Sequence, residues 1–263
     1  MPNYTLTVSD IEIQRYLFMA EAAQATEATL WQEAGIVAGA VVADVGCGPA
    51  AVSAVMASLV GPSGRVIGID RDDQALAAAR SVVERSGATN VELRSGEAWA
   101  SGLEPASVDV AVMRHVLAHN APDEQRIVDH LAGLVRPGGS VYLVDILWAG
   151  MRVIGADPEL EDLNTAYAEL HRRRGNDLEP GIRLGQLLTN AGLNVVTHIG
   201  TFDIVALPPA IRPPAWAARD QMLAEGIVSN DDLQRWEAAF ERTDALATRP
   251  TMFIPRFVGI GRR

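Results

Sequence analysis

Residues 41–50 read VVADVGCGPA, and this stretch decides the fold class. A short apolar run rich in valine, 41–45, is followed at once by Gly46 and Gly48. The small-residue stretch 49–60 then has the composition of a helix with proline in its first turn. Glycines between a strand and its helix allow a tight turn and let ligand atoms lie against bare backbone. In a doubly wound sheet this is the place where a ligand binds.

Short apolar runs and amphipathic stretches alternate along the chain on either side of this loop. The expected strands are residues 41–45, 65–70, 91–94, 108–113 and 140–146. The expected helices between them are residues 49–60, 72–86 and 122–135. Because strand and helix alternate this regularly, the pattern predicts βαβ units and a parallel sheet covered on both faces by helices.

The two flanks of this region are more helical. Residues 9–36 have a helical pattern, which we expect in two segments broken near residues 24–26. After residue 145 we expect helices at 158–174 and 182–191, a strand at 194–203, a loop with four prolines, two further helices and a last strand at 252–261. We interpret this part as the end of the same sheet, interrupted by helical insertions.

Composition limits the classes of partner. The chain has 263 residues, with 33 acidic and 22 basic side chains and a net charge of −11, so its long-range field disfavours nucleic acid and anionic lipid. Its one cysteine, Cys47, fits a reducing compartment. The first ten residues are polar and do not have the composition of an export signal. We therefore expect a cytoplasmic protein that binds neither nucleic acid nor membrane.

Acidic residues accompany the glycine loop. Asp44 lies in the end of the first strand, where it would suit a cationic amino group better than a diphosphate. Asp70 ends the second strand, about 20 residues beyond the loop, which is where an acidic residue binds ribose hydroxyls. Gly96-Glu97-Ala98 follows the third strand. Three such sites at the carboxyl ends of three successive strands predict one binding crevice for a nucleoside with a cationic group.

The sequence here resembles the class I S-adenosylmethionine-dependent methyltransferases. The resemblance covers residues 34–152 and is carried by the motifs DVGCGPA, GIDRD, SGEA, RHVLAHN and LVRPGGSVYLVD. It implies a doubly wound, mostly parallel seven-stranded α/β sheet of Rossmann-like type, with the last strand antiparallel and with helical lid insertions. It also implies S-adenosylmethionine as cofactor and S-adenosylhomocysteine as product. Two positions depart from the family pattern, Ala50 at the third glycine and Glu97 where aspartate is commoner.

The resemblance also implies the contacts of the cofactor. In the family the glycine loop lies against the methionine moiety, the acid of the second strand binds the ribose, and the acid after the third strand lies by the adenine amino group. The cofactor-binding residues implied in this way are Asp44, Gly46, Cys47, Gly48, Asp70, Arg71, Glu97, Ala98 and Arg114.

The acceptor side is less defined by sequence. No Asn-Pro-Pro-Tyr sequence follows the fourth strand, and the chain looks most like methyltransferases of quinone and secondary-metabolite pathways. We expect an N-terminal helical lid at 1–36, a cofactor-binding core at 37–147 and the rest of the sheet with a substrate lid at 148–263, all in one domain. The expected lid aromatics are Tyr4, Tyr16, Phe18, Trp148, Tyr167, Trp216 and Trp236. Tyr16, Trp148 and His171 are the expected pocket residues.

The predicted function is methyl transfer to oxygen, nitrogen or carbon of a small, aromatic or polyketide-like acceptor by a monomer or homodimer. His119 and His115 are the candidate bases, because histidine titrates near neutral pH. Their spacing gives only half of a zinc site and no third ligand stands nearby, so no metal is expected. One alternative is a member of the fold that keeps the cofactor but catalyses a rearrangement or cyclisation. Another is a nicotinamide dehydrogenase, against which Asp44 and Pro49 argue.

Overall fold

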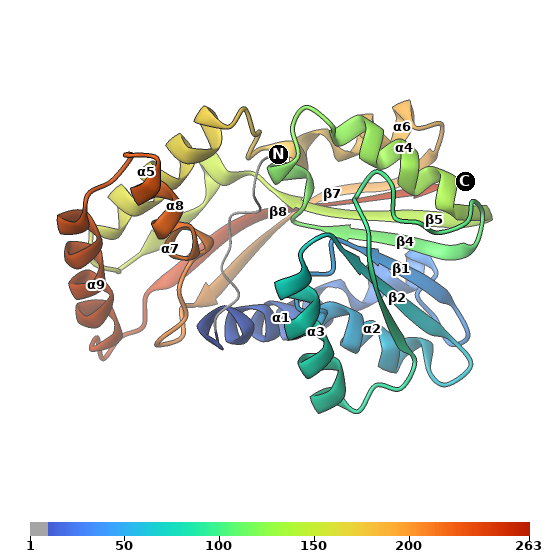
Figure 1. The fold of residues 1–263 in the computed structure, drawn as a ribbon, viewed down its shortest axis with the longest axis horizontal. Coiled ribbons are helices and arrows are strands. Elements are labelled where there is room, and N and C mark those ends of the chain that lie inside the picture. Colours follow the sequence, from blue (N-terminus) through green and yellow to red (C-terminus); the bar gives the residue numbers. More distant parts are fainter. Residues whose placement is uncertain (1–9) are drawn as a thin grey trace.

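A mostly parallel sheet forms the centre of the described chain, residues 10–263 of the computed structural model (Figure 1). Its strands are β1 (Val41–Val45), β2 (Arg65–Asp70), β3 (Val91–Ser95), β4 (Val108–Arg114), β5 (Val135–Ile146), β6 (Arg152–Ile154), β7 (Asn194–Ala206) and β8 (Thr251–Arg262). The α-helices are α1 (Asp10–Ala34), α2 (Ala51–Val60), α3 (Asp73–Ser86), α4 (Glu124–Leu134), α5 (Leu160–Arg173), α6 (Leu184–Asn190), α7 (Pro214–Ala217), α8 (Arg219–Ala224) and α9 (Asn230–Asp244). Short 3-10 turns are η1 (Leu117–His119), η2 (Trp148–Gly150) and η3 (Pro180–Arg183).

The strand order is β3-β2-β1-β4-β5-β8, with β7 and β6 also paired to β8. Strands β1 to β5 run parallel, and β8 is antiparallel to β5, β6 and β7. The predicted doubly wound α/β class with an antiparallel last strand is therefore confirmed. The chain order reverses between β1 and β4, so their carboxyl ends border the crevice where such a sheet binds ligands. The eighth strand beyond the expected seven is β6, only three residues long.

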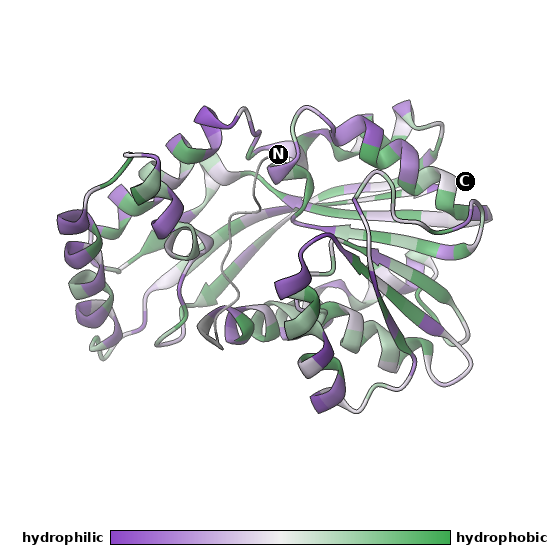
Figure 2. Ribbon diagram, in the orientation of Figure 1, coloured by the Kyte–Doolittle hydropathy of each residue, from purple (hydrophilic) through white to green (hydrophobic). Residues whose placement is uncertain are grey.

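The sheet is packed on both faces. Helices α1 and α2 bury Trp31 and Met56 against one face, where the strands contribute alternate residues such as Val42 and Val110. Helices α4 and α6 bury Leu131 and other side chains on the opposite face. The central strands β4 and β5 are accordingly largely hydrophobic in Figure 2. This burial on two faces explains why the strands read as continuous apolar runs in the sequence.

A second, smaller core lies at the far end of the long β7–β8 ribbon (Figure 1). Helix α5 packs there on α7, α8 and α9 through Leu163, Tyr167, Trp236 and Phe240. Helix α9 begins at a capping box, in which the Ser229 hydroxyl accepts from the backbone N–H at its third position. These helices are the insertions expected after β5, and they form one wall of the large cavity described below.

Several boundaries differ from the sequence-based expectation. Helix α1 runs without a break through residues 24–26, where the Thr26 hydroxyl donates to the carbonyl of Ala22. Strand β5 begins at Val135, before the glycine turn, and a Cβ on Gly139 would lie 2.5 Å from the carbonyl oxygen of Asp109. Three helices, not two, follow the proline-rich loop.

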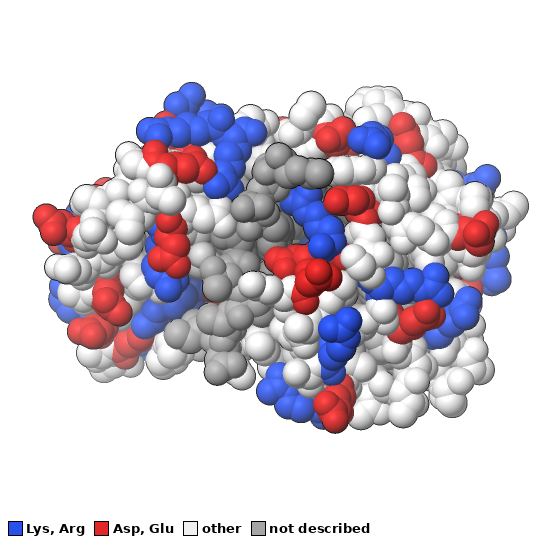
Figure 3. Space-filling model, in the orientation of Figure 1, with Lys and Arg blue, Asp and Glu red and all other residues white. Residues whose placement is uncertain are grey.

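The charged side chains lie mostly in pairs of opposite sign. On the face seen in Figure 3, arginines and acidic residues are interspersed in the described part of the surface. The run Arg172, Arg173 and Arg174 at the end of α5 forms ion pairs with Glu169 and Glu225. None of the helices in residues 10–263 is long and apolar enough to cross a membrane.

Candidate active site

The glycine loop between β1 and α2 is held against the end of β2. The backbone N–H groups of Gly46 and Cys47 both donate to the carbonyl of Ile69, at 2.7 and 3.0 Å. Gly46 and Gly48 have φ values of +80° and +53°, a region that favours glycine. A Cβ on Gly46 would lie 2.5 Å from Cγ2 of Val116. The loop therefore presents bare backbone at the crevice between β1 and β4.

The loop departs from the expected third glycine without changing its path. Ala50 is buried and has a φ of +58°, so an alanine adopts the left-handed geometry that glycine takes more easily. Burial, with the nearby charges of Asp44 and Asp70, raises the pKa of the Cys47 thiol. Cys47 therefore stays protonated. At this position the loop presents its backbone groups to a ligand, and not a thiolate.

Asp44 lies at the carboxyl end of β1 and is almost fully buried. Its Oδ2 accepts a hydrogen bond of 2.5 Å from the hydroxyl of Ser53 in α2. Burial raises the pKa of the Asp44 carboxyl to about 6, although the Ser53 hydrogen bond and the charge of Arg114 act in the opposite direction. A carboxyl in this state is stabilised as the anion when a cationic group binds beside it.

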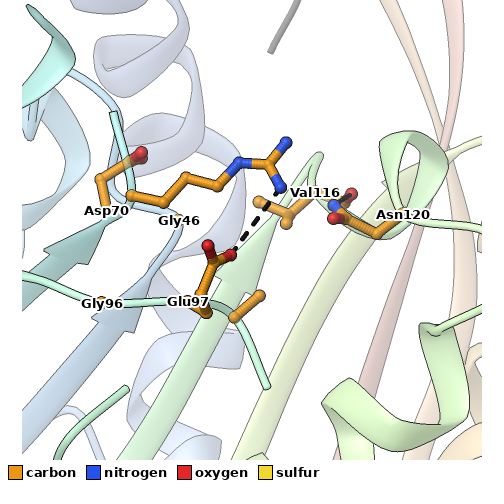
Figure 4. A pocket seen from close by; sticks show the side chains of 8 residues that line it. Gly46, Asp70, Gly96, Glu97, Val116 and Asn120 are labelled. Carbon is orange, nitrogen blue, oxygen red and sulfur yellow. Dashed lines mark hydrogen bonds and ion pairs between the residues drawn. The ribbon is translucent and has the colours of Figure 1, made fainter. Parts of the chain in front are cut away.

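Asp70, Glu97 and Arg71 meet in a narrow pocket of about 40 Å³ at the ends of β2 and β3 (Figure 4). Asp70 accepts hydrogen bonds from the backbone N–H groups of Gly48 (2.8 Å) and Asp72 (3.0 Å), which fixes its carboxylate beside the glycine loop. Arg71 and Glu97 form an ion pair at 3.8 Å.

The residues of this region fit S-adenosylmethionine. Oε2 of Glu97 is buried and accepts no hydrogen bond within the described chain, and its charge is balanced there by the ion pair with Arg71. Each oxygen of the Asp70 carboxylate accepts one backbone hydrogen bond and keeps a further lone pair for a hydroxyl. The two glycines leave the space that a Cβ would fill. Ala98 lines the same pocket, as does Asn120, which the sequence argument had not assigned.

A large cavity of about 650 Å³ adjoins the glycine loop. Its lining includes Asp44, Gly46, Cys47 and Gly48 from the loop region, and Arg114, His115 and His119 from the end of β4. Tyr16 and Phe18 of α1, Trp148 of η2 and Tyr167 of α5 contribute aromatic walls. Distant segments are thus brought together around one space. Tyr4 lies outside the described residues, Trp216 and Trp236 belong to the smaller core, and His171 stands behind the cavity wall.

His119 and His171 belong to a cluster of aromatic rings with Tyr167. The rings of His119 and His171 lie 4.9 Å apart between centroids, and His171 contacts Tyr167 edge to face at 4.4 Å. Burial lowers the pKa of His119 to about 4 and that of His171 to about 3. Burial together with the charges of Arg114 and Arg256 also lowers the pKa of His115. The expectation of titration near neutral pH is therefore wrong, and these side chains are neutral and weakly basic.

His115 occupies a strained position. Its φ is +56°, which is unusual for a residue with a side chain, and its backbone N–H donates to the carbonyl of Val144 at 2.8 Å. Such strain clusters at functional sites. The geometry turns the chain sharply at the carboxyl end of β4 and places the His115 side chain in the cavity wall.

Arg114 takes part in a buried ionic network under α1. Its guanidinium donates to Oε1 of Glu27 at 2.6 Å, and Arg256 of β8 pairs with the same oxygen at 2.7 Å. Tyr142 donates to Oε2 of Glu27 at 2.8 Å, and Arg256 also pairs with Asp203. Burial alone would raise the pKa of Glu27, but the two arginines outweigh it and lower that pKa. The network ties α1 to β4, β5 and β8 beside the loop.

Asp145 is the titratable cavity residue that the sequence argument missed. It ends the motif LVRPGGSVYLVD, is fully buried and accepts hydrogen bonds from the backbone N–H groups of Ile146 (3.0 Å) and Ala118 (3.4 Å). Burial raises the pKa of its carboxyl to about 7. Its position at the carboxyl end of β5, next to the strand that carries His115, was the available signal.

A family model described as a methyltransferase domain matches residues 36–198. The ubiquinone biosynthesis O-methyltransferase of Cupriavidus pinatubonensis is 38% identical over 171 residues, which are 62% of this chain and 64% of that protein. The arsenite methyltransferase of Halobacterium salinarum is 35% identical over 114 residues, or 43% of this chain and 29% of that one. A SAM-dependent methyltransferase from Aquifex aeolicus has the same fold, with a TM-score of 0.55 at 20% identity over 73% of this chain and 93% of its own. The chain thus spans less than two thirds of the length of these curated relatives.

Proposed function

The chain belongs to the methyltransferase domain family, and we propose that it transfers a methyl group from S-adenosylmethionine to oxygen, nitrogen or carbon of a small organic acceptor. The observation that carries this proposal is the cavity of about 650 Å³, whose lining runs from the glycine loop to an apolar, aromatic chamber. S-adenosylmethionine supplies a methyl group on a positively charged sulfur. The protein contributes chiefly by placing the acceptor in line with that methyl group.

The cofactor would be held by the loop and by the carboxylates around it. Asp44 and the backbone of Gly46, Cys47 and Gly48 form the methionine side. The adenosine side consists of Asp70, Arg71, Glu97 and Ala98. Arg114 acts on Asp44 through its charge, since its guanidinium is bound to Glu27 and its charge opposes the rise in the pKa of the Asp44 carboxyl.

A hydroxyl or amine that gains a methyl group must lose a proton. His119 and His115 line the cavity, but their lowered pKa values make them weak proton acceptors at neutral pH. The pKa of Asp145, about 7, lies in the range where a general base works best. Asp145 and His119 line the same cavity, and the backbone N–H of Ala118, next to His119, donates to Asp145. We therefore assign Asp145 the role of proton acceptor and His119 that of positioning the acceptor molecule.

The acceptor we propose is a flat, largely apolar molecule of the phenol or quinol kind. Tyr16, Phe18, Trp148 and Tyr167 give the cavity aromatic walls that suit such a ring. Arsenite is a weaker candidate, because soft centres of this kind are bound by thiolates. The chain has one cysteine, and its thiol stays protonated.

We also propose that the chain works in the three parts expected from its sequence. Residues 1–36 and 148–263 supply the acceptor walls, and residues 37–147 bind the cofactor. Support comes from the lining of the cavity, to which α1, η2, α5 and the β7–β8 ribbon all contribute. Substrate choice would then depend on these flanking parts.

The test begins with calorimetric titration of the protein with S-adenosylmethionine and, separately, with NADH. We expect binding of the first compound only, and weaker binding in Asp70→Asn, which loses half of its acceptor capacity for ribose hydroxyls. Asp73→Asn is the matched control, since Asp73 is exposed at the start of α3. Release of S-adenosylhomocysteine in the presence of phenols and quinols then measures methyl transfer and separates it from cyclisation. Failure of S-adenosylmethionine to bind would refute the proposal.

A further inference from the structure

One buried oxygen in the large cavity has no hydrogen-bond donor. Oδ1 of Asn164 is buried, and among the described residues that line this cavity it is the one buried side-chain oxygen without a hydrogen-bond partner. Buried polar atoms in native proteins are nearly always paired, so an exception requires an explanation. Asn164 lines the cavity, so a molecule bound there would supply the missing hydrogen-bond donor.

The fold directs Asn164 to the cavity. Helix α5 packs Leu163 and Leu170 into the smaller core with α7, α8 and α9. Leu160, Asn164 and Tyr167 line the cavity, and residues spaced by three or four positions share one face of a helix. The amide is therefore placed on a helix, where Glu161 and Ala168 also line the cavity.

Two other polar groups of the cavity lining are already paired. Asp203 is paired with Arg256 in the ribbon, and the Thr165 hydroxyl donates to the carbonyl of Glu161 on α5. Asn164 differs from them because its Oδ1 is buried and has no donor among the described residues. The cavity lining also contains apolar side chains, among them Leu207, Phe240 and Ile254.

We propose that Asn164 determines specificity by accepting a hydrogen bond from a hydroxyl or N–H group of the acceptor molecule. This inference rests on the proposed function only in treating the bound molecule as the methyl acceptor. The hydrogen bond to Asn164 is a binding contact and needs no methyl transfer. Helix α5 belongs to the insertion after β5, whereas the glycine loop follows β1. Asn164 thus lies outside the cofactor-binding part of the chain. It favours molecules with a free hydroxyl or N–H group over those in which this group is alkylated.

A matched pair of ligands tests this directly. 4-Hexylphenol and 4-hexylanisole have the same apolar body, but only the phenol can donate a hydrogen bond. Calorimetric titration of the full chain, without S-adenosylmethionine, should show the phenol binding about tenfold more tightly, which is the effect of one net hydrogen bond. In Asn164→Leu the two ligands should bind within about twofold of each other, with the anisole bound at least as well as by the wild type.

The controls separate this contact from others. Thr165→Val changes the adjacent side chain, whose hydroxyl is already bonded, and should keep the tenfold preference. Asn164→Met provides a second, unbranched apolar variant if the leucine variant does not fold. A preference that persists in both Asn164 variants, or a wild type that binds neither ligand or prefers the anisole, overturns the proposal. These titrations measure binding and not methyl transfer. Their result can therefore be interpreted even if the proposed function fails its own test.

Discussion

Replacing Asp145 by asparagine should change the pH dependence of stability. Asp145 is fully buried, and it accepts hydrogen bonds from the backbone N–H groups of Ala118 and Ile146. Burial raises the pKa of the carboxyl from an ordinary 3.8 to about 7. Between those two values the folded protein keeps a proton that the unfolded chain has released. The free energy of unfolding therefore falls as pH rises through this window.

The size of the effect follows from the shift in pKa. A difference of about three units corresponds to about 4 kcal/mol, at 1.36 kcal/mol per unit. About 2.5 kcal/mol of this is lost between pH 5 and pH 8, because the unfolded carboxyl is already ionised at pH 5. Asparagine does not titrate, so the Asp145→Asn substitution removes this loss. The asparagine amide also weakens one hydrogen bond, at a cost of about 1 kcal/mol. This cost lowers the free energy of unfolding equally at pH 5 and at pH 8, so it does not affect the difference between them.

Urea denaturation of both proteins at pH 5 and pH 8 measures the difference. The variant should gain about 2.5 kcal/mol relative to the wild type between the two pH values. Asp129→Asn, an exposed change on α4, should show no such gain. Asp44 also has a raised pKa, but it is present in both proteins and cancels. Parallel pH curves for the wild type and Asp145→Asn would refute the assignment of a buried, protonated carboxyl at pH 5.

Two further substitutions examine the loop and the ionic network. Gly46→Ala should weaken S-adenosylmethionine binding by calorimetry about tenfold or more, because a positive φ costs alanine about 1–2 kcal/mol and the new methyl lies 2.5 Å from Val116. Gly61→Ala, with a similar φ but nothing within 4 Å, should leave the affinity unchanged, and equal effects would contradict the steric argument. Glu27→Gln should lower the free energy of unfolding in urea by about 3–5 kcal/mol, because it leaves Arg114 buried without its anion and Arg256 with Asp203 alone. The exposed Glu21→Gln on the same helix should change it by less than about 0.5 kcal/mol, and a similarly small change for Glu27 would show that the network adds no stability.

The cofactor half of the site could be predicted because its signals are local. Gly46, Asp70 and Glu97 each follow a strand, and the carboxyl ends of neighbouring parallel strands meet at one edge of a sheet. The order of residues along the chain therefore fixes which side chains meet. Asp145 also lies at the carboxyl end of a parallel strand, so the same rule predicts its place at this edge of the sheet. From the sequence, this residue was considered only as part of a family motif.

The acceptor half could not be predicted, because long-range packing decides it. Asn164 reaches the cavity only because Leu163 and Leu170 bury another face of α5 against helices that begin more than 40 residues later in the chain. Burial of His119 and His171 is likewise a tertiary property, and it removes the neutral-pH titration that residue type alone suggests. Composition names the candidate groups, but their state depends on how much water the fold excludes.

That exclusion of water acts on acids and bases in opposite directions, and this bears on the proposed chemistry. It raises the pKa of Asp44 and Asp145, and it lowers the pKa of His115 and His119, because the charged form of each group is disfavoured. Charge near the loop is therefore costly unless it is balanced. A reaction that begins with a sulfonium cation and a carboxylate, and ends with a neutral thioether, a neutral carboxyl and a neutral methylated product, removes two charges from such a place. In the proposed function, an acceptor that loses its proton to Asp145 would therefore gain from this environment, and an acceptor without a removable proton would not.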